Sequence, residues 1–364
     1  MKKKIISLLV TILVMFSISG CAATNTQIAY TVYPIGYIIQ RLAGNTINSV
    51  TIQNNTIVQR SEILSNYDEI LSNSSILINI GQLEPYLSVY STEISKLIDK
   101  RLDLSNLNAI YTFKRYTPII TDEEVTYIEG PYYKGELFEM IDTNTKDLFL
   151  WLDPIAMLSM SKDIKEYLIT TYPDDKNIFE ENYKLLETDL VRIDAAYQSL
   201  ATKVASSNKE IKFVSMSASF GNWQKTYGIQ LYPVILSKYG ALPNDEQLEI
   251  IKNRIIADNV QYIVYEPNMT SDMIALFNQL QEELNLTRVE LSNLSSLTTS
   301  QESEGKDYLS IMYENLSVLE TMAIEKTSSI TPTEELEEEI EEENIDLDDV
   351  EENLEEEEKD GKKE

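Results

Sequence analysis

The 364-residue chain contains no histidine and a single cysteine. Without histidine the common serine and cysteine hydrolase triads cannot be built, and one cysteine allows neither an internal disulfide nor a cysteine-built metal site. The sequence also contains no G-x-S-x-G, P-loop or G-x-G-x-x-G motif. These absences argue against an enzyme of the common classes, so we expect a protein that is not an enzyme.

Basic residues are also scarce. The chain has 30 Lys and Arg against 60 Asp and Glu, a formal net charge of −30, and a chain this negative repels nucleic acid. From Glu334 to Glu358, 17 of 25 residues are acidic and none is basic. A block of like charge cannot bury enough apolar surface to fold alone, so we predict a disordered acidic tail over 328–364. Such a tail is either inert, a weak cation buffer or a contact for a basic partner.

The apolar run at 5–16 is too short to span a membrane. It follows Lys2–Lys4 and precedes "ISGC" at 18–21, and small residues before a cysteine resemble the lipobox of bacterial lipoproteins. We therefore expect residues 1–20 to be a lipoprotein signal peptide and Cys21 to be the acylated residue. This predicts a lipid-anchored protein on the extracytoplasmic face of the cell membrane. The alternative is a secretory peptide with an incidental cysteine.

Short strand and helix patterns alternate between these ends. The alternation predicts βαβ units with mainly parallel sheets, in an α/β fold. "DLFLWLDP" at 147–154 is predicted to end a buried strand and open a helix. Asn244 and Gln247 have the spacing of a capping box before a stripe of Leu248, Ile251, Ile255 and Ile256. The expected strands are 28–33, 50–52, 76–81, 211–216 and 262–268, and the other expected helices are 36–42 and 60–73.

One long helix is predicted between the two halves. Its apolar residues recur at spacings of three and four, which makes one helix of about 30 residues, about 45 Å long. It is either a dimerising coiled coil or a rigid spine for two Rossmann-like βα lobes, and its position favours the spine. The stripe consists of Phe179, Tyr183, Leu186, Leu190, Ile193, Tyr197, Leu200 and Val204. The expected domains are an N-terminal lobe at 21–172, the spine at 173–208 and a C-terminal lobe at 209–327.

Six segments in order resemble the metal-binding lipoproteins of zinc and manganese ABC transporters. They are "YTVYPIGYIIQRLAGN", "LSNSSILINIGQLEPYL", "LWLDP", "SASFGNWQKTYGI", "YIVYEPN" and "EGKDYLSIMYENLSVLETM". The resemblance implies a helical-backbone solute-binding protein that works with an ABC permease and its ATPase. It also implies a metal site of three histidines and a carboxylate, at positions that here carry Gln59, Phe149, Ser217 (Met216 with a one-residue slip) and Ser292.

These four side chains bring no imidazole, thiolate or carboxylate, the usual zinc donors. We therefore expect no metal or other cofactor, with zinc unlikely. An oxygen-ligand site for Mn²⁺ or Ca²⁺ stays open, with Glu62, Asp153 and Glu266 as candidate donors. The same three residues also fit turn, helix-cap and ligand-supporting roles.

The region around these four positions has a second interpretation: a cleft that binds an uncharged organic solute of unknown identity. Its walls would be Phe149, Trp151, Tyr33 and Trp223, with hydrogen bonds from Gln59, Ser217 and Ser292, although buried aromatics at strand ends are commonly core. The tyrosine-rich segment 111–147 is either a surface contact loop or an inert insertion. The favoured function is a solute receptor of an ABC transporter with a degenerate metal site; the alternative is a surface scaffold or adhesin. Neighbouring permease and ATPase genes would favour the first.

Overall fold

The structure is a computed structural model that describes residues 27–107, 110–121 and 124–326. Cys21, the expected signal peptide and the acidic tail lie outside the described residues. Within the described ranges, no helix is both long and apolar enough to cross a membrane.

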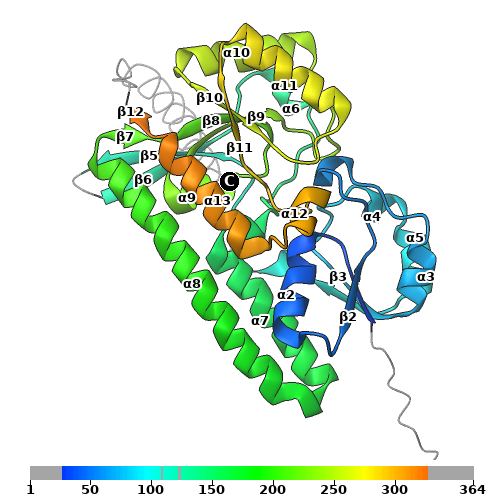
Figure 1. The fold of residues 1–364 in the computed structure, drawn as a ribbon. Helices are drawn as coiled ribbons and strands as arrows, with labels where there is room; N and C mark the ends of the chain where they lie inside the picture. The colour runs from blue at the N-terminus through cyan, green and yellow to red at the C-terminus, as the bar shows by residue number, and fades with distance from the viewer. Residues whose placement is uncertain (1–26, 108–109, 122–123, 327–364) are drawn as a thin grey trace, which may run out of the picture.

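The N-terminal lobe is built on a four-stranded parallel sheet (Figure 1). Its strands, in the spatial order β2-β1-β3-β4, are β1 (Gln27–Tyr30), β2 (Asn48–Thr51), β3 (Ser74–Asn79) and β4 (Arg101–Asp103). Its helices are α2 (Tyr33–Ala43), α3 (Tyr67–Ser72), α4 (Tyr86–Val89) and α5 (Ser91–Leu97), with 3-10 turns η1 (Val58–Arg60) and η2 (Leu104–Asn106).

The C-terminal lobe repeats this plan in the spatial order β11-β10-β8-β9, again all parallel. Its strands are β8 (Lys212–Ser217), β9 (Gln230–Ile235), β10 (Tyr262–Tyr265) and β11 (Thr287–Glu290). Its helices are α9 (Asn222–Tyr227), α10 (Asp245–Ala257), α11 (Ser271–Glu283), α12 (Thr299–Ser303) and α13 (Tyr308–Thr321). A short antiparallel pair, β7 (Lys209–Glu210) with β12 (Ile324–Glu325), joins the segment just before β8 to the segment just after α13.

The predicted capping box at the start of α10 is confirmed. Asn244 Oδ1 accepts from the Gln247 amide at 2.8 Å, and the Asn244 amide donates to Gln247 Oε1 at 3.0 Å. Leu248, Ile251 and Ile255 are buried, as the stripe predicts. Ile256 is 63% exposed, so its place in the stripe was wrong; it lies next to Ile255 in sequence, and adjacent helix positions point about 100° apart.

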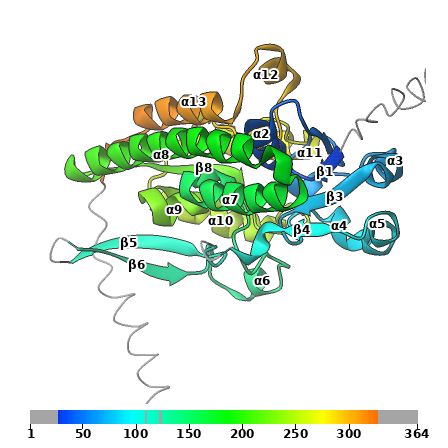
Figure 2. The same ribbon diagram turned by 90° about the horizontal axis from the view of Figure 1, so that it is seen from below.

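The long helix is α8 (Lys176–Ser206), of 31 residues, preceded by the 3-10 turn η4 (Pro173–Asp175). It runs beside α7 (Pro154–Thr171) and also contacts α2 and α13 (Figures 1 and 2). All of the predicted stripe is buried except Tyr183, which is partly exposed. The stripe is used inside the chain, so it needs no dimer partner. The prediction of two Rossmann-like lobes joined by one long helix is confirmed.

The segment 147–154 contains no strand, which corrects the prediction. Leu150–Leu152 form a 3-10 turn (η3), and among the described residues the ladder contact next to this segment is an isolated bridge from Thr112 to Lys146. The apolar side chains from Leu148 to Leu152 are all buried instead of alternating between a buried and an exposed face. The helix start is correct: Asp153 caps α7 and Pro154 stands in its first turn.

The helix predicted at 60–73 is confined to α3, Tyr67–Ser72. The preceding residues are held extended against the end of β2. Asn54 and Glu62 form a backbone hydrogen bond of 3.0 Å, and the Leu64 amide donates to Ile52 O at 2.9 Å. Polar composition alone did not reveal this tertiary pairing.

The tyrosine-rich segment is folded rather than a surface loop. Its central part is an antiparallel hairpin of β5 (Arg115–Thr121) and β6 (Glu124–Gly130), followed by α6 (Glu136–Glu139). The hairpin lies on the side of α9 away from α8 (Figure 2). Tyr116, Tyr132 and Tyr133 are buried, and their rings contact those of Tyr111, Phe113 and Phe138 respectively.

Candidate functional site

The two lobes meet where the strands of each sheet end. Ligand sites of parallel α/β sheets lie at these carboxyl ends. Here the two lobes are bonded directly to each other: the Ile57 amide donates to Asn268 O at 3.2 Å, and the Tyr33 amide donates to Ser295 O at 3.1 Å. Arg60 reaches across to Gly240 O at 2.9 Å and to Asp272 at 3.0 Å. The two lobes are therefore closed against each other in this structure.

Glu266, directly after β10, is a buried carboxylate at this junction. It is fully buried, and its Oε1 accepts from the Ser217 amide at 2.8 Å. Its Oε2 accepts from Ser217 Oγ at 2.5 Å and from Asn293 Nδ2 at 2.9 Å. Burial raises the pKa of Glu266, and these donors partly offset that rise by favouring the carboxylate. Ser217 Oγ also lies 2.5 Å from Ser219 Oγ, so the network continues into the turn after β8.

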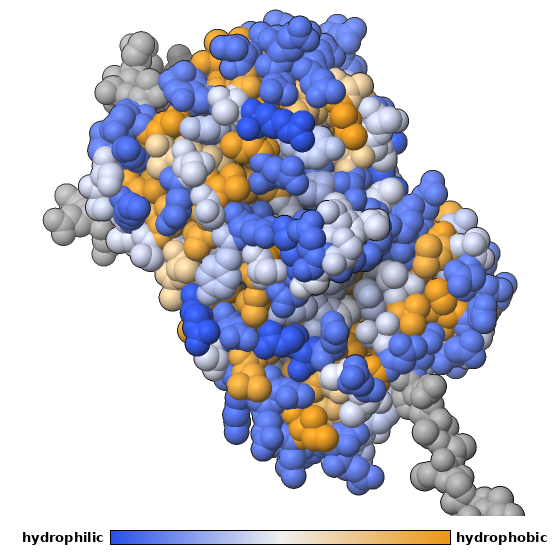
Figure 3. Space-filling view, viewed as in Figure 1, coloured by the Kyte–Doolittle hydropathy of each residue, from blue (hydrophilic) through white to orange (hydrophobic). Residues whose placement is uncertain are grey.

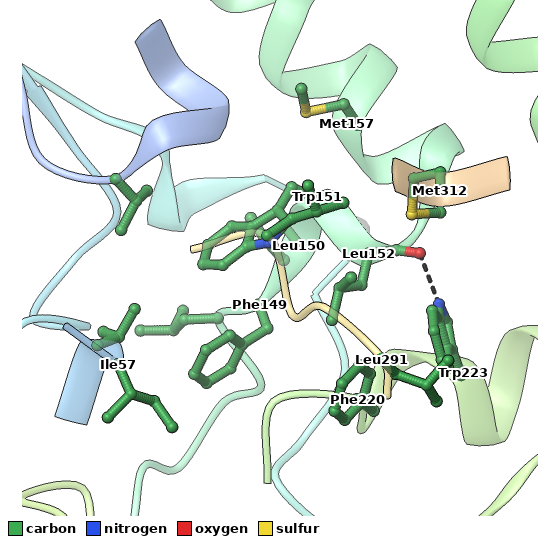
Figure 4. Packing of buried hydrophobic residues seen from close by; sticks show 14 of the residues in the cluster. Ile57, Phe149, Leu150, Trp151, Leu152, Met157, Phe220, Trp223, Leu291 and Met312 are labelled. Atoms are coloured by element: carbon green, nitrogen blue, oxygen red, sulfur yellow. Dashed lines mark hydrogen bonds between the residues drawn. The ribbon is translucent and has the colours of Figure 1, made fainter. Parts of the chain in front are cut away.

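Phe149 lies in the apolar packing between the lobes. It is 3% exposed, its ring centroid is 5.3 Å from that of Trp151, and Ile57 lies across from it (Figure 4). Its backbone oxygen accepts from Asn222 Nδ2 at 3.2 Å. A phenyl ring at this position supplies no ligand atom.

Trp151 and Trp223 are fully buried and join the segment 149–152 to the C-terminal lobe. Trp151 Nε1 donates to Asn293 O at 2.7 Å. Trp223 Nε1 donates to Leu152 O at 2.8 Å, the dashed line in Figure 4. Both indole N–H groups are thus satisfied by backbone oxygens. The two rings belong to the core rather than to an open pocket wall.

Gln59 and Ser292 differ in their surroundings. Gln59, on η1, is 8% exposed, and its buried Oε1 has no hydrogen-bond partner among the described residues. Ser292 is held from α13, because Asn315 bonds both its amide and its carbonyl at 2.9 Å. The Ser292 hydroxyl accepts from the Leu294 amide rather than from the Glu266 network.

Two of the three candidate oxygen donors, Glu62 and Asp153, do not join the network around Glu266. Glu62 is exposed, on the segment that pairs with Asn54. Asp153 Oδ1 accepts from the Ile155 and Ala156 amides at 2.8 and 3.2 Å, and its Oδ2 accepts from Thr226 at 3.0 Å. These contacts make Asp153 the cap of α7. The junction therefore brings together Glu266, Ser217 and Asn293, with Phe149 and Trp151 beside them.

Sequence reasoning missed Asn293 and Asp147. Asn293 lies one residue beyond Ser292, in the polar run "SNLSS" after a strand, and that run was the available signal. Asp147 begins the stretch "DLFLWLDP" and is buried, with Oδ1 accepting from the Phe149 amide at 3.1 Å. Burial raises the pKa of Asp147 to about 7. An acidic residue before an apolar run gives no sequence sign of burial.

The donors at this junction are one carboxylate, amides and hydroxyls. Among the residues that the structure describes, no group of three or more His, Cys, Asp or Glu side chains could hold a metal ion together. Oxygen donors of this kind suit hard cations, and zinc also accepts carboxylate oxygen.

Comparison with known proteins identifies the family. The family model described as "Zinc-uptake complex component A periplasmic" matches residues 28–322. The zinc-binding lipoprotein AdcA of Streptococcus pneumoniae serotype 4 is 24% identical over 336 residues, covering 91% of this chain and 63% of AdcA. The chain thus spans about three fifths of that relative's length.

Solved structures share the fold. The periplasmic zinc-binding protein TroA of Treponema pallidum aligns with a TM-score of 0.63 and 14% identity, covering 82% of this chain and 99% of TroA. A mutant of the laminin-binding adhesin Lmb of Streptococcus agalactiae aligns with a TM-score of 0.61 and 17% identity, covering 82% and 99%.

These findings correct one expectation. Zinc was expected to be unlikely because the aligned positions lack histidine, but the matched family is a zinc-uptake family and AdcA is a zinc-binding protein, so the comparisons point to zinc. The expectation that the chain is not an enzyme is confirmed, since the family consists of transporter solute-binding proteins. The match covers most of the chain, and the chain belongs to the zinc-uptake component A family of ABC-transporter solute-binding proteins.

Proposed function

We propose that this chain is the extracytoplasmic solute-binding component of a metal-uptake ABC transporter, with zinc as its ion. The observation that carries the proposal is the family match over 28–322 on a fold of two lobes joined by α8. The ion is cargo, which the protein would bind between its lobes and release to a permease.

The proposed zinc seat is the junction around Glu266. Its carboxylate is the charge that would offset the cation, with the Ser217 hydroxyl as a neighbouring oxygen donor. Asn293 presents its Nδ2 group to Glu266, and its Oδ1 accepts from Ser295, so Asn293 would hold the carboxylate rather than the ion. Gln59, Phe149, Ser217 and Ser292 are proposed as the substituted positions of the family's ligand set. Because no imidazole is present, we expect weaker zinc binding than a three-histidine site gives.

Entry of an ion requires a local opening, since the Glu266 oxygens are already satisfied and the lobes are bonded together. One long helix permits small tilts of the lobes rather than a wide hinge motion. Binding also requires Glu266 to be deprotonated, and its pKa is raised by burial. Zinc affinity should therefore increase as the pH rises through that pKa.

The remaining parts of the proposal concern anchoring and partners. Cys21 would carry the lipid that tethers the protein to the extracytoplasmic face of the cell membrane. An ABC permease and its ATPase would receive the ion. Support comes from the order of basic, apolar and small-Cys segments at the N-terminus and from the family match.

The test is zinc binding by the full chain purified in detergent, measured by equilibrium dialysis with elemental analysis and by the thermal unfolding midpoint. We expect about one zinc per chain and a rise of the midpoint with zinc concentration. Glu266→Gln should abolish both, because it keeps the shape and removes the charge. Reinstating histidine with Phe149→His and Ser217→His should strengthen binding at least about tenfold if the ligand positions are correctly matched.

The matched control is Glu62→Gln, an exposed carboxylate on the other side of the junction, which should leave zinc binding unchanged. If neither the native chain nor the histidine variant retains zinc, the proposed site is wrong. Zinc bound equally by Glu266→Gln would place the ion elsewhere.

A second candidate function is a surface scaffold or adhesin that keeps the fold without carrying a ligand. It is favoured by the absence of an acidic, histidine or cysteine cluster among the described residues, and a laminin-binding adhesin shares this fold. Deleting the gene separates the two functions. Slower zinc uptake by the cells indicates transport, whereas unchanged uptake with reduced surface adhesion indicates a scaffold.

A further inference from the structure

A groove on the N-terminal lobe lies beside the junction between the lobes, since its lining includes Tyr33, whose amide donates to Ser295 O. Its volume is about 570 Å³, within the range of about 300–1,000 Å³ for small-molecule sites. None of the proposed ligand positions contributes to it. The residues that line it are Tyr30, Tyr33, Gly36, Tyr37, Gln40, Gly44, Asn45, Thr46, Ile47, Asn48 and Ser49.

The groove is lined from one side of α2 and from the segment 45–49, which runs into the start of β2. The opposite side of α2 buries Ile35, Ile38 and Leu42 in the core. Spacings of three and four place Tyr33, Tyr37 and Gln40 together on the groove side. In the space-filling view this part of the face includes pale residues of intermediate hydropathy (Figure 3).

Gly36 shapes the floor of the groove. A Cβ atom added there would lie 2.4 Å from Cζ of Tyr30, so the glycine lets the tyrosine ring lie directly against the helix. Tyr30 is thereby held between β1 and α2 with part of its surface exposed. This close approach is a specific feature of the groove rather than an accident of an open surface.

The lining carries no charged side chain, although a quarter of the whole chain is charged. Arg41 on the same helix is not part of the lining; it donates to Tyr37 Oη at 2.6 Å and pairs with Asp189 of α8 at 2.6 Å. Burial, with a smaller contribution from the nearby Glu302, raises the pKa of Tyr30 to about 12. The tyrosine therefore stays neutral, and the acidic surroundings disfavour an anionic ligand.

Several polar groups in the groove are free to bind a ligand. The side chains of Tyr30, Gln40 and Asn45 make no hydrogen bond to another part of the described chain, whereas Thr46 and Asn48 bond to Ala43 O and Gln27. Amides both donate and accept, and tyrosine rings offer flat apolar faces beside a hydroxyl. Sugar rings present the matching chemistry, with C–H faces that stack on aromatics and hydroxyls that bond to amides.

We propose that this groove binds a neutral saccharide. The test is saturation-transfer NMR of the full chain with chitotriose and cellotriose, followed by titration. We expect at least one of these neutral trisaccharides to bind, with its ring C–H groups closest to the protein. The anionic trisaccharide 3′-sialyllactose should bind at least about tenfold more weakly, since the surroundings are acidic.

Gln40→Ala combined with Asn45→Ala should weaken saccharide binding about tenfold, because two hydrogen-bonding amides are removed. Both residues are exposed, so the variant should fold. Gly36→Ala should also weaken binding by displacing the Tyr30 ring. The control Gln198→Ala, an exposed glutamine on α8, should change nothing.

Absence of saturation transfer from both neutral saccharides, or binding that is unchanged in the double variant, would overturn the proposal. Tighter binding of the sialylated probe would also overturn it. The zinc response of the double variant should equal that of the native chain, so failure here is independent of the proposed transport function.

Discussion

Two buried acidic side chains, Asp147 and Glu84, make the stability of this protein depend on pH. Burial raises the pKa of Asp147 and that of Glu84 to about 7 each. Between about pH 4 and pH 7 the folded chain therefore holds protons that the unfolded chain has released. This contribution to the free energy of unfolding is fully present at low pH and is lost as the pH rises through 7.

Asp147→Asn should remove part of the fall in the free energy of unfolding that occurs as the pH rises to 7. The amide mimics the protonated carboxyl and keeps an oxygen for the Phe149 amide. At pH 8 we expect the variant to be more stable than the native chain, on the order of 1–3 kcal/mol, with a shallower fall between pH 5 and 8. Urea unfolding across this pH range is the measurement.

The exposed Asp99→Asn should follow the native pH dependence. An Asp147→Asn variant that is less stable than the native chain at pH 8, or equally dependent on pH, would show that Asp147 is ionised without penalty in the fold.

Residue identities at the junction were partly predictable. The motif positions found Ser217 and Glu266, because "SASFG" and "YEPN" stand at the ends of the strand patterns 211–216 and 262–268. They could not show that Asn293 rather than Ser292 bonds Glu266. A shift of one residue after a strand reverses the direction of a side chain, and no periodicity survives in the loop to fix it.

At the scale of elements, α8 tests the spine interpretation. Leu190 is fully buried, and Leu185, five residues earlier on the same helix, is 63% exposed. Leu190→Ala should cost about 2–5 kcal/mol, because it opens a cavity where α8 packs against its neighbours. Leu185→Ala should stay within about 0.5 kcal/mol.

Chemical denaturation of both variants provides the measurement, with gel filtration to follow the oligomeric state. A large loss for Leu185→Ala would mean that the exposed side of α8 is covered in solution. That result would revive the coiled-coil interpretation.

The sequence predicted helices correctly where a periodic apolar pattern or a capping motif was strong. The stripe of α8 and the Asn244–Gln247 cap needed only local geometry. The strand prediction for 147–152 was wrong because a short apolar run has the same sequence pattern in a buried strand and in a buried turn. The helix at 60–73 was shortened by backbone bonds to residues of the preceding segment, which composition does not encode.

At the scale of the whole molecule, Arg60 ties the lobes together. It bonds Gly240 O and pairs with Asp272, with side-chain exposures of 32% and 45% for the ion pair. Arg60→Ala should speed exchange of the Ile57 amide, which donates across the junction, about 5- to 30-fold, corresponding to about 1–2 kcal/mol.

Hydrogen exchange followed by mass spectrometry or NMR is the measurement, and amides of α8 should keep their native rates. Arg192→Ala serves as the control, because its partner Asp189 lies on the same helix. Equal acceleration in α8 would mean general destabilisation rather than opening of the lobes.

The sequence by itself determined the two-lobed α/β plan, the long helix and the family, because these depend on periodicity and on motif order along the chain. It also determined that no imidazole can take part in binding. Only the tertiary structure decided which polar groups meet Glu266, that the aromatic residues of "DLFLWLDP" are core, and that α2 and the segment 45–49 enclose an uncharged groove. These outcomes depend on contacts between residues far apart in sequence, whose geometry is set when the lobes pack together.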